Sequence, residues 1–314
     1  MKKRKLGKSG LEIAPLALGG NVFGWTADEA TSFAILDRFI DAGFNFIDTA
    51  DVYSIWAPGH KGGESEAVLG KWIKARGKRA KALIATKVGM RMADDRKGLK
   101  KAHIMRSVEE SLKRLNTDHI DLYQSHTDDA EAPLEETLGA YEALLKQGKV
   151  RAIGASNYTA PRLKTALDAA SGGLPRYQSL QPLYNMMERA FEADLGPLCA
   201  KENIGVIPYY SLASGFLTGK YKSAADLKKS PRGGGVKKYL DARGQRVIAA
   251  LEAAAKQHGA TPAQVALAWL MAKPAVTAPI VSATSVAQLD EILKAASLKL
   301  EAKTMAALDK ASAA

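Results

Sequence analysis

The stretch FNFIDTADVY, residues 44–53, decides the fold. Its first half is a short apolar run of strand-forming residues, which predicts a buried β-strand. The run ends abruptly at Asp48, and Asp51 and Tyr53 follow in a predicted loop. We therefore expect a buried strand that delivers polar side chains at its carboxyl end.

Two later segments end in the same way. The run ALIAT at 82–86 leads into Lys87, and the run IDLYQS at 120–125 leads into His126. In a barrel of parallel strands the carboxyl ends lie at one mouth, where active sites are built. The polar side chains that end these three strands are therefore expected to meet.

Strand-like and helix-like segments alternate along the whole chain. We predict strands near residues 15–20, 44–48, 81–86, 119–125, 149–155, 176–180, 204–209 and 277–281. We predict helices near residues 26–42, 66–74, 104–115, 134–146, 161–170, 194–203, 245–258 and 262–273. Apolar strands that are each followed by a helix indicate an α/β fold, best fitted by a closed (β/α)8 TIM barrel in a single domain over residues 1–314.

A doubly wound open sheet is the alternative architecture. It usually has a G-x-G-x-x-G turn that opens a helix after the first strand, and the glycines of residues 19–24 lack that spacing. Residues 5–13 predict a β-hairpin, and Thr26 to Glu29 predicts a capping box at the first helix. Residues 211–242, rich in Gly, Lys and Ser, predict a long functional loop.

The composition argues against a membrane-spanning protein and against a nucleic-acid-binding protein. The chain is 46% hydrophobic and 25% charged, and no apolar run is long enough to span a membrane. The basic N-terminus has no apolar signal region after it, so we expect a cytoplasmic protein. The single cysteine, Cys199, is expected to be a buried apolar residue. The net charge of +12 comes from separate clusters without interleaved aromatics, so no nucleic-acid partner is expected.

The polar residues at the predicted strand ends match a known family. Asp48, Tyr53, Lys87 and His126, in the contexts DTADVY, IATKVG and DLYQSH, resemble the catalytic tetrad of the aldo-keto reductases. The segments GASN and PYYSLASGFLTGKY also match, so the resemblance covers almost the whole chain. It implies that the N-terminal hairpin closes the bottom of the barrel and that the cofactor is a nicotinamide dinucleotide.

The tetrad suggests a mechanism for carbonyl reduction. Tyr53 is expected to donate a proton as the carbonyl oxygen gains charge, with the Lys87 ammonium lowering the pKa of the phenol. Asp48 is expected to pair with Lys87, because a buried lysine needs an acidic partner. A neutral His126 is expected to orient the carbonyl by a hydrogen bond.

The resemblance also implies a cofactor site. Ser156, Asn157 and Gln181 match residues that hydrogen-bond the nicotinamide carboxamide, and Tyr209, or Tyr210 if the register slips, matches the aromatic that stacks on the ring. The remaining matches lie in two loops near the pyrophosphate and adenosine: Ser211, Leu212, Gly215, Leu217, Thr218, Lys220, Ser282, Thr284, Gln288 and Glu291. The family usually has Ser-Pro-Leu after the stacking tyrosine, whereas this chain has Tyr-Ser-Leu at 210–212.

NADP(H) is expected rather than NAD(H), although NAD(H) is possible. The loop after the last strand offers only hydroxyl and amide groups to a 2′-phosphate, so the cation must come from elsewhere. The insert supplies a cluster of basic residues: Lys220, Lys222, Lys228, Lys229, Arg232, Lys237 and Lys238. Phe23, Trp25 and Trp56 are expected to wall the pocket for a small carbonyl substrate.

Two other functions compete with a reductase. The first is a metal-dependent barrel hydrolase or isomerase with ligands among Asp48, Asp51, His126, Asp128 and Asp129. A neighbouring Lys87 would compete with the cation, so no metal is expected. The second is a redox-sensing subunit of an ion channel, although the chain shows no extra N-terminal segment for such a partner. The physiological substrate and the oligomeric state stay open.

Overall fold

The computed structural model describes residues 1–230 and 233–313. Eight parallel strands form the central sheet, in the order β10-β3-β4-β5-β6-β7-β8-β9. Their bounds are β3 Ala17–Gly19, β4 Phe46–Asp48, β5 Leu83–Val88, β6 Ile120–Ser125, β7 Val150–Ser156, β8 Ser179–Gln181, β9 Gly205–Val206 and β10 Ile280–Val281. The predicted strands are all present, and most are shorter than the apolar runs.

The sheet curls into a (β/α)8 barrel, which confirms the predicted fold. A parallel bridge joins Val206 to Val276, and the amide of Ile280 donates to the carbonyl of Pro208 at 2.9 Å. These contacts connect the last strand region to β9 and bring the two edges of the sheet together. Because the strands are parallel, all their carboxyl ends open at the same mouth.

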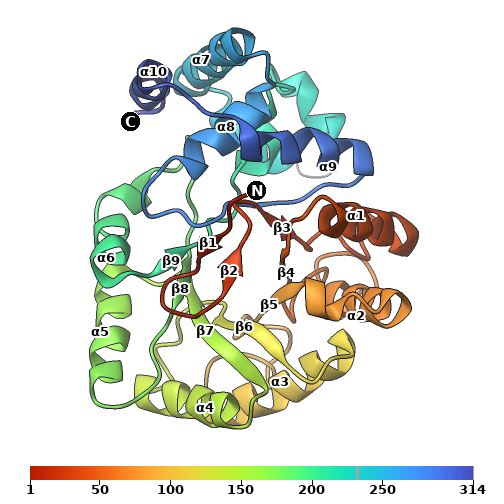
Figure 1. Ribbon diagram of the computed structural model, residues 1–314, viewed down its shortest axis with the longest axis vertical. Helices are drawn as coiled ribbons and strands as arrows, with labels where there is room; N and C mark the ends of the chain where they lie inside the picture. Colours follow the sequence, from red (N-terminus) through yellow and green to blue (C-terminus); the bar gives the residue numbers. More distant parts are fainter. Residues whose placement is uncertain (231–232, 314) are drawn as a thin grey trace.

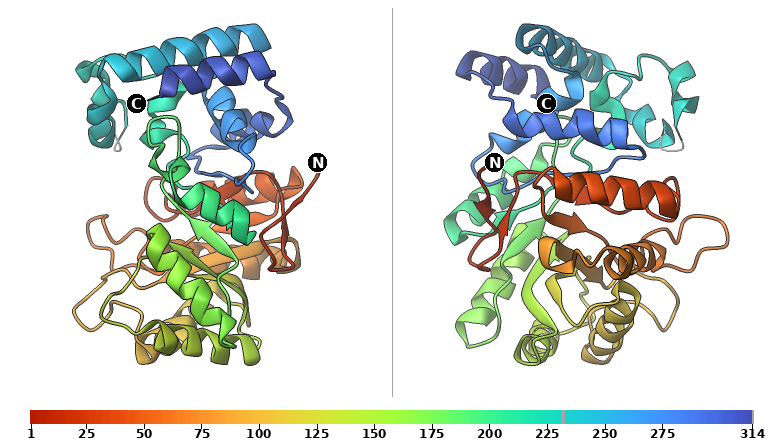
Figure 2. Two further views of the ribbon diagram at one scale, coloured as in Figure 1. Left: turned by 90° about the vertical axis from the view of Figure 1, so that its left-hand side faces the viewer. Right: turned by 45° about the vertical axis from the view of Figure 1, so that its right-hand side comes forward.

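Helices cover the outside of the barrel (Figure 1). Their bounds are α1 Glu29–Asp41, α2 Glu64–Arg76, α3 Lys101–Leu115, α4 Leu134–Lys146, α5 Ala160–Ser171, α6 Leu195–Glu202, α7 Ala242–His258, α8 Pro262–Met271, α9 Val286–Leu293 and α10 Ala302–Ser312. Short 3-10 helices are η1 Arg79–Lys81, η2 Ala190–Glu192, η3 Ala213–Thr218, η4 Ala224–Lys229, η5 Gly233–Tyr239 and η6 Lys294–Ser297. The C-terminal α10 lies along α7, outside the ring of helices (Figure 2).

The N-terminal hairpin closes the bottom of the barrel, as predicted. Strands β1 (Arg4–Lys5) and β2 (Glu12–Ile13) pair antiparallel. Leu6, Leu11 and Ile13 are buried against barrel residues such as Phe46 and Leu122. The hairpin therefore supplies the apolar floor of the interior.

The start of α1 differs from the predicted capping box. Asp28, rather than Thr26, is the N-cap, because its carboxylate accepts from the amide of Thr31 at 2.8 Å. The Thr26 hydroxyl is buried without a hydrogen-bond partner in the described part of the chain. Thr26 and Asp28 can both cap a helix, and aspartate is the more favourable of the two at the N-cap position.

The predicted loop at 211–242 contains more regular structure than expected. The 3-10 helices η3, η4 and η5 occupy most of its described residues, and the side chains of Phe216 and Tyr239 pack at a ring distance of 5.5 Å. Arg232, one of the predicted cations of this insert, lies outside the described residues. No helix in the described ranges is long and apolar enough to cross a membrane.

Candidate active site

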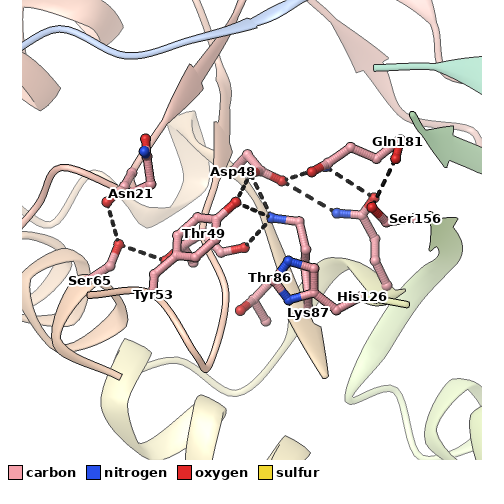
Figure 3. A network of polar contacts seen from close by, with 12 residues as sticks. Asn21, Asp48, Thr49, Tyr53, Ser65, Thr86, Lys87, His126, Ser156 and Gln181 are labelled. Atoms are coloured by element: carbon pink, nitrogen blue, oxygen red, sulfur yellow. Dashed lines mark hydrogen bonds and ion pairs between the residues drawn. The ribbon is translucent and has the colours of Figure 1, made fainter. Parts of the chain in front are cut away.

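The four predicted tetrad residues converge at the mouth of the barrel (Figure 3). Asp48 ends β4, Lys87 lies near the end of β5, and His126 directly follows β6. Tyr53 comes from the turn after β4, where the amide of Tyr53 donates to the carbonyl of Ala50 at 3.2 Å. The parallel register thus brings together side chains that are far apart in the sequence.

Ser54, the residue after Tyr53, fixes the turn that carries Tyr53. Ser54 has a left-handed backbone with φ of 74°, which is rare for a residue with a Cβ. Its buried hydroxyl donates to the carbonyl of Phe23 at 3.1 Å, which compensates for the unfavourable conformation. This sharp turn directs the Tyr53 phenol back toward the end of β4.

Lys87 is the centre of the hydrogen-bond network. Its ammonium lies 2.7 Å from the Asp48 Oδ2, 2.8 Å from the Tyr53 hydroxyl and 2.8 Å from the carbonyl of Thr49. The Tyr53 hydroxyl also donates to the Asp48 Oδ2 at 3.2 Å. All three donors of the ammonium are therefore satisfied, and the phenol is fixed between a cation and an anion.

Burial dominates the protonation states of the network. Burial lowers the pKa of Lys87, and the Asp48 carboxylate opposes this effect. Burial also raises the pKa of the Tyr53 phenol well above its ordinary value, and Asp48 raises it further. The expectation that Lys87 lowers the pKa of Tyr53 is therefore corrected, because desolvation and the nearby carboxylate prevail. The phenol stays protonated and can act as an acid.

His126 has the neutral state that was predicted from the sequence. Burial lowers the pKa of its imidazole well below the ordinary value, and the nearby Lys87 ammonium adds to this shift. Its ring lies 5.9 Å from the ring of Tyr53 in an edge-on arrangement. A neutral imidazole beside the phenol can donate a hydrogen bond without adding a second positive charge to the site.

The predicted carboxamide-binding residues lie directly beside the tetrad. Ser156 ends β7 in register with Gln181 of β8, and its hydroxyl donates to the Gln181 carbonyl at 2.8 Å. Asn157 donates to the carbonyl of His126 at 2.9 Å and accepts from the Tyr209 hydroxyl at 2.8 Å. The structure thus brings these four predicted residues together. A hydroxyl and two amides fit a ligand amide, because such groups can both donate and accept.

The two candidate aromatics after β9 differ in their surroundings. Tyr209 is anchored to Asn157, whereas Tyr210 is 53% exposed and has a left-handed backbone with φ of 52°. The rings of the two residues lie 5.2 Å apart. The hydrogen bond to Asn157 makes Tyr209 the better candidate for the stacking residue.

The segment that follows is a strained turn. Ala213 and Ser214 adopt left-handed backbones, and Gly215 follows with φ of 96°. The Ser211 hydroxyl donates to the carbonyl of Pro208, and Leu217 is fully buried, so only its backbone can face a ligand. Strain of this kind is often found at ligand-binding turns.

The side chains in the loop after β10 form hydrogen bonds within the protein. Ser285 caps α9 by accepting from the amide of Gln288 at 3.2 Å, but the Gln288 side chain accepts from the amide of Thr284 at 3.0 Å and does not complete the capping box. Ser282 donates to the Asn21 side chain at 2.6 Å. Glu291 is exposed on α9.

The predicted substrate aromatics divide into two kinds. Trp25 and Trp56 lie at the mouth with ring centroids 5.7 Å apart, and Trp56 is 47% exposed. The ring of Trp56 lies 6.0 Å from that of Tyr53. Phe23 is fully buried, so its side chain presents no surface to a ligand here, which corrects its predicted role. Its place in the first loop was right, but its ring packs into the core.

The sequence reasoning missed Gln124. Its amide donates to the Asp48 Oδ1 at 3.4 Å, and Gln181 donates to the same oxygen at 2.9 Å. A glutamine within an apolar strand, two residues before His126, was the available signal. Its side chain points to the same face as His126 because side chains alternate along a strand.

Three of the five candidate ligands of the alternative metal site are engaged elsewhere. Asp128 pairs with Arg162 at 2.7 Å, and Asp129 accepts from the amide of Leu99 at 2.7 Å. Asp48 is paired with Lys87. Within residues 1–230 and 233–313, no three His, Cys, Asp or Glu side chains are grouped so that they could hold a metal ion.

Comparison with known proteins gives a consistent result over the full length. Residues 15–313 match the model of the aldo/keto reductase family. The chain is 36% identical to the uncharacterised oxidoreductase YrpG of Bacillus subtilis, covering 98% of this chain and 95% of that protein. It is 32% identical to the protein tas of Escherichia coli, covering 98% and 97%. It is also 35% identical to a probable voltage-gated potassium channel subunit beta of Arabidopsis thaliana, covering 94% and 91%.

Proposed function

The chain belongs to the aldo/keto reductase family, and on this premise we propose that it reduces an aldehyde or ketone to an alcohol with NADP(H) as its cofactor. One observation carries the proposal. The Tyr53 phenol, kept protonated by burial, lies 2.8 Å from the Lys87 ammonium at the mouth of the barrel. This geometry supports Tyr53 as the acid for a carbonyl oxygen that gains negative charge.

Each member of the tetrad has a distinct part in the proposed reaction. The nicotinamide, when bound, supplies the hydride to the carbonyl carbon. Tyr53 donates its proton to the carbonyl oxygen, and the Lys87 ammonium stabilises the phenolate that remains. Asp48 fixes the position of Lys87, and a neutral His126 orients the carbonyl oxygen. The proton and the hydride together convert the carbonyl group into the alcohol.

The residues proposed to hold the cofactor follow the order of the barrel strands. Ser156, Asn157 and Gln181 would hold the carboxamide, and Tyr209 would stack on the nicotinamide ring. The residues proposed for the pyrophosphate and the adenosine are Ser211, Leu212, Gly215, Leu217, Lys220, Ser282, Thr284, Gln288 and Glu291. The phosphate site of a barrel normally lies at the loops after strands 7 and 8, which supports this assignment.

The preference for NADP(H) is proposed from the charges of the insert. Lys222, Lys229 and Lys238 are already paired with carboxylates, at 2.9, 2.7 and 2.5 Å. Among the described residues of the insert, Lys220, Lys228 and Lys237 make no ion pair. Of these, Lys220 lies beside Gly215, where an added Cβ would come 3.7 Å from the Lys220 Nζ, and it is the cation we propose for a phosphate group of the cofactor.

Small carbonyl compounds are the proposed substrates, with Trp25 and Trp56 forming an apolar wall beside Tyr53. The direct test is to follow the loss of NADPH absorbance with a panel of aldehydes, ketoses and quinones. Tyr53→Phe should lower kcat by roughly 10²-fold to 10⁴-fold while NADPH affinity, measured by fluorescence, stays the same. Tyr210→Phe, which removes a nearby exposed phenol, is the matched control and should keep wild-type kcat. Wild-type turnover by Tyr53→Phe would refute the proposed acid.

A nicotinamide-binding regulatory subunit is the second candidate. It is favoured by the similarity to the probable channel subunit of Arabidopsis thaliana. The two candidates differ in turnover, because a sensor would bind NADPH but oxidise it very slowly. Multiple turnovers per second with any carbonyl of the panel would support the reductase, and tight binding with less than one turnover per minute would support the sensor.

A further inference from the structure

Gln124 is a fully buried amide in the interior of the barrel. It lies on β6 between Leu122, which belongs to the interior apolar cluster, and His126 at the mouth. Burying an amide is unfavourable unless its polar atoms are hydrogen-bonded. The contacts of Gln124 therefore indicate why a polar side chain is kept at this depth.

Both ends of the Gln124 amide contact the catalytic network. Its Nε2 donates to the Asp48 Oδ1 at 3.4 Å, and its Oε1 accepts from the Gln181 Nε2 at 3.4 Å. Gln181 also donates to the Asp48 Oδ1 at 2.9 Å, a contact visible in Figure 3. The side chains of Gln124, Gln181 and Asp48 therefore hydrogen-bond to one another in a closed triangle, and Asp48 joins this triangle to the rest of the tetrad.

The two oxygens of Asp48 consequently have separate partners. Oδ2 accepts hydrogen bonds from the Lys87 ammonium at 2.7 Å and from the Tyr53 hydroxyl at 3.2 Å. Oδ1 accepts hydrogen bonds from the side-chain amides of Gln181 and Gln124. A carboxylate that is bound on both oxygens cannot rotate without breaking contacts on both sides. The amide donors also stabilise its negative charge, which holds the Lys87 ammonium.

A glycine on the neighbouring strand leaves room for the Gln124 side chain. Gly154 of β7 is in register with Gln124, and a Cβ at that position would lie 3.1 Å from the Gln124 Cγ. The same Cβ would overlap the Ser179 hydroxyl. The space for the amide is thus created by the neighbouring strand.

We propose that Gln124 is a positioning residue, which fixes the orientation of Asp48 and joins it to Gln181 of the cofactor site. The inference rests on the proposed reductase function. Loss of the amide would leave Asp48 Oδ1 with the Gln181 donor alone, at 2.9 Å, and would loosen the carboxylate that orients Lys87. The acid Tyr53 would then be held less firmly, while Gln181 of the proposed cofactor site keeps its contact with Asp48.

Two substitutions of similar length separate this role from simple packing. Gln124→Met keeps the volume and removes both hydrogen bonds, so kcat should fall about tenfold while NADPH affinity stays within about twofold. Gln124→Glu keeps a donor only while its carboxyl is protonated. Asp48 would repel the ionised form, whereas Lys87, which is in register with Gln124, would attract it; Tyr53 and His126 are the other titratable groups of the tetrad.

The pH profile is the readout that packing would not change. Activity of Gln124→Glu should be near the wild-type value at low pH and should fall as the introduced carboxyl ionises, an inflection absent from wild type and from Gln124→Met. Gln178→Met, which removes an amide near the N-terminal hairpin, is the control and should leave kcat unchanged. Wild-type kcat in Gln124→Met, or a pH profile of Gln124→Glu parallel to that of wild type, would overturn the proposal.

A measurement without turnover separates failure of this inference from failure of the proposed function. Unfolding by urea is compared for wild type, Gln124→Met, Asp48→Asn and the double variant. If the two side chains interact, the losses of stability are not additive. Additive losses overturn the positioning role, whereas absence of NADPH oxidation by wild type with every carbonyl overturns the reductase and leaves the result of this cycle intact.

Discussion

At the scale of single residues, the ion pair of Lys87 and Asp48 has two separable effects. Both side chains are almost completely buried and lie 2.7 Å apart. Removing one partner of a buried pair leaves an uncompensated charge, which typically costs about 3 to 5 kcal/mol of stability. Removing both partners avoids that cost.

Lys87→Met should therefore lose both carbonyl reduction and stability. The double variant Lys87→Met/Asp48→Asn should regain most of the stability and none of the activity. Urea unfolding and NADPH oxidation, measured on the same preparations, check this expectation. A double variant as unstable as the single one would show that the pair does not contribute through its charges.

Asp51 is a second buried acid and lies three residues after Asp48 in the sequence. Burial, together with the nearby Glu66, raises the pKa of Asp51 to about 8. Glu66 takes the available cation, since Arg114 lies 2.7 Å from its carboxylate. The Oδ1 of Asp51 has no hydrogen-bond partner in the described part of the chain. Asp51 thus holds a proton at neutral pH in the folded protein.

This protonation predicts a pH-dependent stability. The unfolded chain releases the Asp51 proton near pH 4, but the folded chain keeps it until about pH 8. The folded state therefore binds more protons in this window, and its stability falls as pH rises, by about 1.4 kcal/mol per pH unit.

Asp51→Asn should remove that slope, so the variant gains stability relative to wild type between pH 4 and pH 8. Urea unfolding at several pH values measures the difference. Asp95→Asn changes an acid that is 78% exposed and serves as the control. A difference between Asp51→Asn and wild type that does not vary with pH would contradict the assignment.

At the scale of elements, the contact between α2 and α3 depends on Gly70. A Cβ at this position would overlap the backbone carbonyl oxygen of Arg114. The close approach places Arg114 beside Glu66 of α2, which lies next to the site. A glycine inside a helix usually weakens it, but here it permits the packing of two helices.

Gly70→Ala should therefore destabilise the protein by about 1 to 3 kcal/mol, despite the higher helix propensity of alanine. Gly139 of α4 has no atom within 4 Å of an added Cβ, so Gly139→Ala should stabilise by roughly 0.5 to 1 kcal/mol. Unfolding midpoints in urea compare the two variants. Effects of the same sign at both positions would refute the packing argument.

At the scale of the whole molecule, the insert after β9 carries a cluster of lysines. Lys220 lies 5.0 Å from the ring of Tyr221, and its ammonium makes no ion pair among the described residues. Lys222, two residues later, is paired with Glu252. The two lysines therefore differ in how much charge they can offer to a phosphate.

NADPH should bind more tightly than NADH, and the difference should shrink as salt rises because screening weakens charge contacts. Lys220→Ala should lose roughly ten- to a hundredfold in NADPH affinity, and Lys222→Ala should lose much less. Fluorescence titrations of both cofactors at two salt concentrations measure this. Equal or tighter binding of NADH at low salt would exclude the proposed preference.

The local pattern of the chain was enough to predict the barrel and the meeting of Asp48, Tyr53, Lys87 and His126 at its mouth. Apolar runs that end in Asp48, Lys87 and His126 predicted strands with polar ends, and parallel strands bring such ends to one mouth. The hairpin and the carboxamide residues were likewise predicted from local pattern and resemblance. These features depend on alternation and spacing, which a chain carries in its order of residues.

The interactions among these residues depend on the folded structure. The upward shift of the Tyr53 pKa comes mainly from burial, and the Phe23 ring is fully buried in the core. Gln124 of β6 reaches Asp48 of β4 across the single intervening strand β5, a contact fixed by barrel register rather than by sequence separation. Desolvation of a side chain and the register between strands are properties of the folded chain, so the order of residues alone did not reveal them.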